Sequence, residues 1–133
     1  MEKTLFDKNG YAVAYISDDY NETIYLPEGR PVAYIYEDRH VYGINGHHLG
    51  WFVDGIIYNN RGERIGFTSS ACPVAPGKDP VKAERYIRDE IRPRWAAPAF
   101  PNLTFKLAEQ DLASFFKEGE APRQIGALTL PQQ

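Results

Sequence analysis

The sequence predicts a mainly β fold with a helical C-terminal extension, in which four tandem β-hairpins are arranged with pseudo-fourfold symmetry. Two observations lead to this prediction: a short segment recurs four times between residues 5 and 70, and the composition changes at residue 71. The 133 residues are 43% hydrophobic and 14% aromatic, which suffices for a packed core and favours strands. We therefore expect a hairpin domain over residues 1–70, followed over 71–133 by a linker and a helical extension that packs on it.

The repeat aligns without a gap from residues Leu5, Ile24, Val41 and Ile57. Each copy begins with an aliphatic residue, an aromatic residue, three variable residues and a glycine. Two variable residues, an aliphatic residue, a small residue and an aromatic residue follow. The shared glycines are Gly10, Gly29, Gly46 and Gly62, and the closing aromatics are Tyr15, Tyr34, Trp51 and Phe67. Agreement in so many columns indicates one structural unit used four times.

Each column has a physical reason. Asp7-Lys8-Asn9-Gly10 is typical of a type I turn closed by a glycine with positive φ, which gives a hairpin with a bulge. Asp54-Gly55 predicts a two-residue turn between hairpins. Strict alternation along each strand predicts that an aliphatic residue such as Val32 shares a face with Tyr34, and that the small Ala33 points the other way.

In this four-hairpin pattern the chain resembles the bacterial four-fold β-flower domain family over roughly Thr4 to Ser70. The resemblance implies a pseudo-fourfold flower of hairpins with helical additions. It carries no assigned activity, so it identifies no functional residue.

The second half reads as a linker and two helices. Cys72 to Gly77 contains two prolines and a glycine, and Asp79-Pro80 is typical of a helix start. We expect a helix from Pro80 to about Ile91, whose apolar side (Ala83, Ile87 and Ile91) docks on the hairpins. A strand is expected over 102–107, a second helix over 109–118 with Leu112, Phe115 and Phe116 facing the core, and a disordered tail over 120–133.

Composition limits the class of protein. The net charge of −3 argues against nucleic-acid binding, and a single cysteine excludes both an internal disulfide and a cysteine-based zinc cluster. No apolar run reaches the length of a signal peptide core or a membrane span, so we expect a cytoplasmic protein without membrane contact. The chain has no nucleotide-binding or nucleophile motif, so we expect no cofactor and lean against an enzyme.

Metal-ligating residues are few. His40 and His47 lie in or near the third repeat, and the links between repeats carry Asp18, Asp38 and Asp54. If the links gather on one rim of a ring, their carboxylates and the imidazoles together provide ligands for a cation. The competing interpretation is that the histidines are ordinary surface residues and that aspartate is simply a good turn residue.

Two further sets of side chains are candidates for binding. Tyr15, Tyr34 and Trp51 provide an aromatic face if they reach the surface. Arg85, Arg88 and Arg92 form one side of the expected helix and suit an anionic ligand or an acidic partner, although such a stripe is often only solvated. We expect a non-enzymatic interaction or scaffold domain that binds a protein partner or itself. The alternative is a small ligand- or metal-binding protein or enzyme that uses the acidic rim and the histidines of the third repeat.

Overall fold

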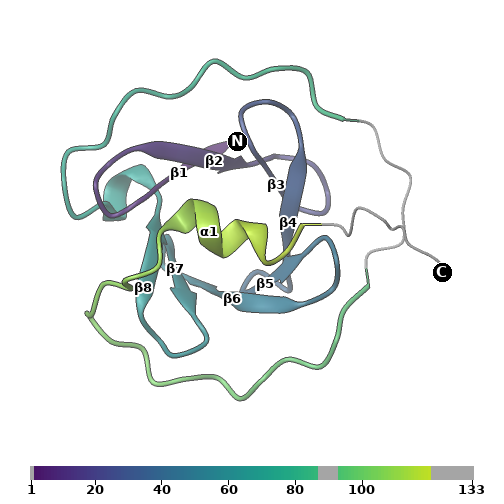
Figure 1. The fold of residues 1–133 in the computed structure, drawn as a ribbon, viewed down its shortest axis with the longest axis vertical. Coiled ribbons are helices and arrows are strands. Elements are labelled where there is room, and N and C mark those ends of the chain that lie inside the picture. Colours follow the sequence, from purple (N-terminus) through teal and green to yellow (C-terminus); the bar gives the residue numbers. More distant parts are fainter. Residues whose placement is uncertain (1, 87–92, 121–133) are drawn as a thin grey trace, which may run out of the picture.

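The computed structural model describes residues 2–86 and 93–120. Eight antiparallel strands, each bonded to its neighbours in sequence, close into a barrel by the pairing of the first with the last (Figure 1). The strands are β1 (Lys3–Phe6), β2 (Ala12–Ile16), β3 (Thr23–Tyr25), β4 (Pro31–Tyr36), β5 (His40–Gly43), β6 (His48–Val53), β7 (Ile56–Asn59) and β8 (Arg64–Phe67).

A short 3₁₀ helix η1 (Ser69–Ala71) follows the barrel, and one α-helix, α1 (Leu112–Lys117), lies across the middle of the ring of strands (Figure 1). Between them the chain runs around the outside of the barrel. We call residues 72–107 the belt, of which residues 87–92 lie outside the described part. No helix of the described residues is long and apolar enough to cross a membrane.

The turns follow the sequence prediction. Gly10, Gly29, Gly46 and Gly62 all have positive φ, between +82° and +105°. Each strand pair joined by one of these turns shows a register shift beside it, which is the expected bulge. Asp54 and Gly55 both have positive φ, as a two-residue primed turn requires.

The bulge reverses the expected facing of the side chains. Ile24 pairs with Ala33 and Tyr25 with Pro31, so Val32 is the extra residue of its strand. Val32 and Ala33 consequently both lie in the central core cluster, whereas Tyr34 belongs to another cluster. The prediction that the aliphatic residue shares its face with the aromatic is therefore wrong, because it assumed strict alternation across a position where the strand is kinked.

Helix α1 completes the central core. Leu112, Phe115 and Phe116 are buried in the same cluster as the inward-facing barrel residues, which confirms the apolar face expected of the second helix. The helix begins at Leu112, later than expected, because the Asp111 carboxylate caps it by accepting a hydrogen bond of 2.7 Å from the Ser114 amide. A Cβ on Gly66 would lie 2.9 Å from Leu112, so the small residue leaves room for the helix.

The helix expected from Pro80 to Ile91 is wrong for residues 80–86, which form no helix. Their amides bind the barrel turns: the Ala83 amide donates to the Pro27 carbonyl at 2.7 Å, and the Tyr86 amide donates to the Gly29 carbonyl at 3.0 Å. A helix would have used these donors internally. The expected strand over 102–107 amounts to one parallel bridge between Leu107 and Arg64. Ile87, Ile91 and the tail beyond residue 120 lie outside the described residues.

Candidate binding surface

Aromatic residues form pairs where neighbouring hairpins meet. Tyr15 stacks on Tyr25 with ring centroids 5.8 Å apart, and Tyr34 stacks on Tyr42 at 5.9 Å. The corresponding partners at the other two junctions are Trp51 with Tyr58 and Phe67 with Phe6. Tyr15, Tyr34 and Trp51 are only 1%, 2% and 3% exposed, so the expectation that they provide an exposed aromatic face is wrong.

The belt covers these junctions and is bound to each glycine turn by a backbone hydrogen bond. The donors are the amides of Gly77, Tyr86, Trp95 and Thr104, which lie nine residues apart, and the acceptors are the carbonyls of Gly10, Gly29, Gly46 and Gly62, at 2.8 to 3.0 Å. The turn carbonyls therefore have partners in the belt, and the belt in turn gains a fixed register on the barrel.

At the first junction the belt contributes cations. The Arg85 guanidinium lies 5.4 Å from the Tyr15 ring centre and 5.0 Å from that of Tyr25, and its Nε donates to the Tyr15 hydroxyl at 3.2 Å. Lys82 lies 4.7 Å from the Tyr15 ring and pairs with Glu2 at 2.8 Å, and Arg85 also pairs with Glu2. The basic side chains thus face the barrel, whereas Ala83, expected on the docking side, is exposed. Arg88 and Arg92 lie outside the described residues.

The belt also contributes a cation at the second junction, with different partners. The Arg94 guanidinium lies 4.0 Å from the centre of the Tyr36 ring. The Tyr34 hydroxyl donates to the Pro93 carbonyl at 2.9 Å, and the Tyr42 hydroxyl donates to the Trp95 carbonyl at 2.9 Å. The tyrosine hydroxyls of this pair therefore hold the belt backbone, while the belt cation lies over the neighbouring Tyr36 ring.

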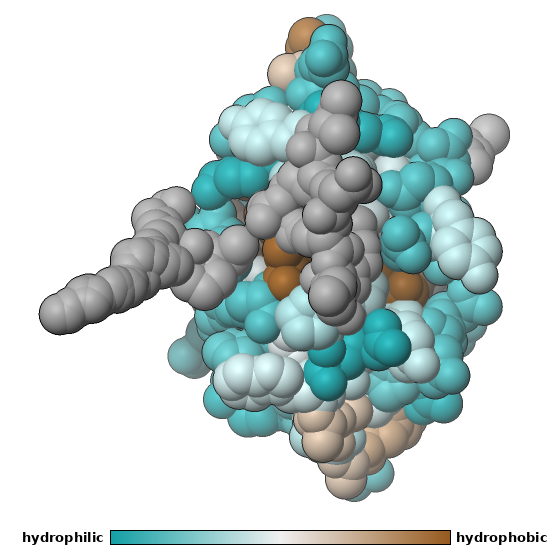
Figure 2. Space-filling model, turned by 90° about the vertical axis from the view of Figure 1, so that its right-hand side faces the viewer, coloured by the Kyte–Doolittle hydropathy of each residue, from teal (hydrophilic) through white to brown (hydrophobic). Residues whose placement is uncertain are grey.

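The belt carries most of the exposed apolar side chains. Seven of the nine large hydrophobic side chains that are exposed among the described residues belong to it: Val74, Val81, Tyr86, Trp95, Phe100, Phe105 and Leu107. Figure 2 shows one face of the molecule, on which hydrophobic residues form separate patches among hydrophilic ones. The other two exposed side chains are Tyr11 and Tyr20, so some tyrosines do reach solvent, as the composition suggests.

The structure pairs His40 with His48, not with His47. His40 Nδ1 lies 3.1 Å from His48 Nε2, and both rings pack against Trp51, whereas the ring of the exposed His47 packs at a tilt against Trp95. Burial lowers the pKa of His48 to about 4, helped by the charge of His40, and burial also lowers the pKa of His40. His47, expected beside His40 as a candidate ligand, lies elsewhere, and His48 takes that place.

The acidic residues of the links between hairpins do not lie together in one site. Asp38 lines one hollow, of about 560 Å³, together with Glu22, Tyr36 and Arg94, whereas Asp54 lines a different one. Burial and the neighbouring Asp38 raise the pKa of Glu22. Asp18 is exposed. Within the described ranges, no three His, Cys, Asp or Glu side chains form a group that could hold a metal ion.

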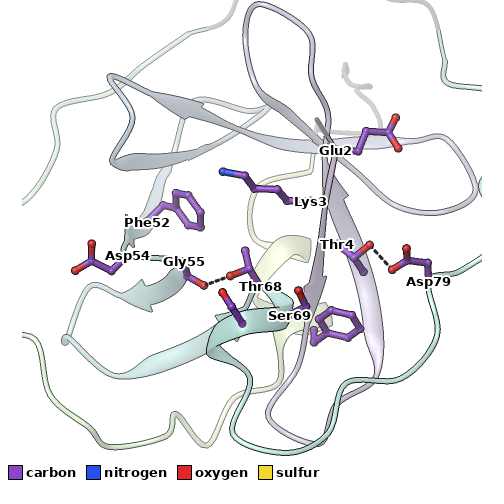
Figure 3. A pocket seen from close by; sticks show the side chains of 11 residues that line it. Glu2, Lys3, Thr4, Phe52, Asp54, Gly55, Thr68, Ser69 and Asp79 are labelled. Carbon is purple, nitrogen blue, oxygen red and sulfur yellow. Dashed lines mark hydrogen bonds between the residues drawn. The ribbon is translucent and has the colours of Figure 1, made fainter.

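The other hollow, of about 630 Å³, lies beside β1 and η1. Figure 3 shows the Lys3 side chain reaching across this space towards Phe52, while the carboxylates of Glu2 and Asp54 point away from it. The Thr4 hydroxyl donates to Asp79 at 2.7 Å. The hollow is open and polar, and the residues around it do not converge on one point as a catalytic group would.

A closed barrel of eight strands with an inserted helix and an external belt is the class of fold that these observations define. The chain matches the model of the 4-fold beta flower protein family over residues 3–116, and it belongs to that family. The match includes the belt and nearly all of α1, well beyond the four hairpins on which the resemblance rested. Comparisons with curated proteins and with solved structures give no significant match.

Proposed function

We propose that this protein is a non-enzymatic interaction module whose contact surface is the outer side of the belt. The observation that carries the proposal is the concentration of exposed apolar side chains on residues 74–107, while the barrel interior is filled by its own side chains and by α1. Trp95, Phe100 and Phe105 are aromatic residues of the kind enriched where proteins bind one another.

The repeat supports a finer statement about the scaffold. We infer that the four hairpins are related by pseudo-fourfold symmetry, because the glycine turns, their bulges and the belt hydrogen bonds recur at each of them. A scaffold of this kind presents the belt around its whole circumference. The partner is then a second copy of the chain or another protein that contacts the belt.

Native mass spectrometry of the untagged protein, followed by sedimentation velocity over a wide concentration range, tests the proposal. We expect concentration-dependent association that Phe100→Ser with Phe105→Ser weakens strongly. Tyr20→Ser is the matched control, since Tyr20 is 99% exposed but lies off the belt. Association that responds to Tyr20→Ser but not to the belt variant would contradict the proposal, as would a monomer that carries a bound small molecule.

A further inference from the structure

His40 and His48 form a side-chain pair that the proposed interaction surface does not use. They lie on adjacent strands, β5 and β6, with His40 Nδ1 and His48 Nε2 facing each other at 3.1 Å. The ring centroids lie 4.6 and 4.7 Å from that of Trp51, and the His48 ring also packs edge-on against Tyr42 at 4.9 Å. The Asn60 side chain donates to the His48 carbonyl at 3.2 Å. Both imidazoles are therefore held in place by packing.

The fold does not require histidine at either position. The residues in the column of His48 in the other repeats are Ala12, Pro31 and Arg64, and those in the column of His40 are Thr4, Thr23 and Ile56. Barrel closure and turn geometry are the same in repeats that lack both imidazoles. The pair is thus a feature of one hairpin, added to a scaffold that folds without it elsewhere.

We propose that His40 Nδ1 and His48 Nε2 together bind a divalent transition-metal ion of the class that prefers imidazole, namely Cu²⁺, Ni²⁺ or Zn²⁺. Two nitrogens bound at about 2.0–2.1 Å to one ion, at an angle of roughly 90–110°, are about 2.8–3.4 Å apart. The observed separation of 3.1 Å falls inside this range. Each lone pair then has to point about 35–45° away from the line between the two nitrogens, which ring rotation achieves.

The two rings can hold their protons in positions that leave both facing nitrogens free for the ion. In the metal-free pair one of the facing nitrogens carries a proton and the other accepts it. When the ion binds, each ring keeps one proton on its far nitrogen, Nε2 of His40 and Nδ1 of His48. His48 Nδ1 is buried without a hydrogen-bond partner, so no second hydrogen bond fixes which nitrogen of this ring is protonated.

The remaining coordination positions fall to water or to an atom from a bound partner. In the part of the chain that the structure describes, no Asp, Glu, Cys or third His joins the pair as a further ligand. A site with two protein ligands and open positions binds a metal more weakly than a closed structural site does, and it leaves the ion accessible.

Copper titration of the full, untagged chain tests this site, because Trp51 touches both rings and Cu²⁺ quenches tryptophan fluorescence at short range. Trp95→Phe leaves Trp51 as the single tryptophan. We expect saturable quenching at one ion per chain, reversed by excess Zn²⁺. His40→Gln or His48→Gln in this background should weaken binding by at least roughly 10- to 100-fold, since changing an outer-shell partner of a ligand alone causes a loss of that size. His47→Gln is the matched control and should leave it unchanged.

Quenching without saturation, equal affinity in His40→Gln or His48→Gln, or loss of binding in His47→Gln would each overturn the proposal. If the glutamine variants fail to fold, imidazole ¹⁵N shifts of the unaltered protein decide the matter. Zn²⁺ must then move the signals of His40 Nδ1 and His48 Nε2 and leave those of His47 in place. Shifts at His47 alone would refute the assignment.

Discussion

A Cβ atom on Gly29 would lie 2.1 Å from the carbonyl oxygen of Glu84, because turn and belt meet there backbone against backbone. Gly29 also has φ of +105°, which other residues adopt only under strain. Gly29→Ala should therefore lower the free energy of unfolding by about 1–3 kcal/mol from strain alone, with a further loss from displacement of the belt. Urea unfolding followed by circular dichroism measures the change.

Gly46→Ala separates these two contributions. Gly46 has a similar φ of +95°, but an added Cβ would meet a Pro93 side-chain carbon at 3.1 Å rather than a carbonyl oxygen. The backbone strain is then matched while the clash with the belt is milder, so Gly46→Ala should cost less. Equal losses in the two variants would show that the closer approach of the belt at Gly29 adds nothing to the cost of the substitution.

Phe115 anchors α1 in the barrel. It is 1% exposed and packs in the central cluster, so Phe115→Ala should lower the free energy of unfolding by about 3–5 kcal/mol through the cavity it leaves. Phe105→Ala removes the same atoms from a side chain that is 86% exposed and should change stability little. Thermal unfolding of the two variants provides the comparison. Similar midpoints would mean that α1 does not belong to the core.

Arg85 holds the first arc of the belt. Arg85→Ala removes its cation–π contacts with Tyr15 and Tyr25, worth about 0.5–1 kcal/mol at a partly exposed site, so exchange of the Tyr86 amide should rise roughly two- to fivefold. The Thr104 amide, bound to a different turn, should keep its rate.

Lys78→Ala is the control for charge, since Lys78 is exposed. Native-state hydrogen exchange measures both amides in both variants. A rise at Thr104 equal to that at Tyr86 would mean that the belt opens as one unit instead of arc by arc.

Glu22 should make the free energy of unfolding depend on pH. Its folded-state pKa lies above the ordinary value of 4.5, because burial and Asp38 both disfavour its charge. A raised pKa favours the protonated form in the folded state. The stabilisation is thus complete below the unfolded pKa and is lost as the pH rises through the folded one. Glu22→Gln, which has no such proton to lose, should be more stable than the parent near pH 7 and should lose this part of the pH dependence.

Urea midpoints of parent and variant between pH 4 and 7 measure this difference. Glu28→Gln is the control, because Glu28 is exposed and lies near the other end of the same hairpin. A variant curve parallel to that of the parent would contradict the coupling of Glu22 to Asp38.

The hairpins and their turns could be predicted because a turn position with positive φ favours glycine, and glycine occurs at that position in every repeat. The facing of the side chains could not, since a bulge shifts it and the prediction assumed an unbroken alternation. The same shift bears on the site: Tyr15 and Tyr34 were considered as parts of an exposed aromatic face, whereas each stacks on another tyrosine beneath the belt. The pairing of His40 with His48 needs the register of β5 and β6, which no local pattern contains.

The belt was not predicted because the spacing of its basic residues is also that of one side of a helix. Lys82 and Arg85, three residues apart, are consistent with one side of a helix, but in an extended chain they both reach the barrel by their length. A different signal was present: Arg85-Tyr86 and Arg94-Trp95 are nine residues apart and have the same chemistry. Only a comparison with the hairpin repeat would have given this spacing a meaning.

The hairpin repeat and the nine-residue repeat of the belt donors differ in how they tolerate a change of length. The turn glycines are separated by 19, 17 and 16 residues, so the barrel closes with links of different length between its hairpins. The belt donors keep a spacing of nine throughout, because each interval has to reach from one glycine turn to the next around the barrel. Insertions, tags and grafted peptides therefore belong in the links, whereas a single extra residue in the belt would put every later donor out of step with its turn.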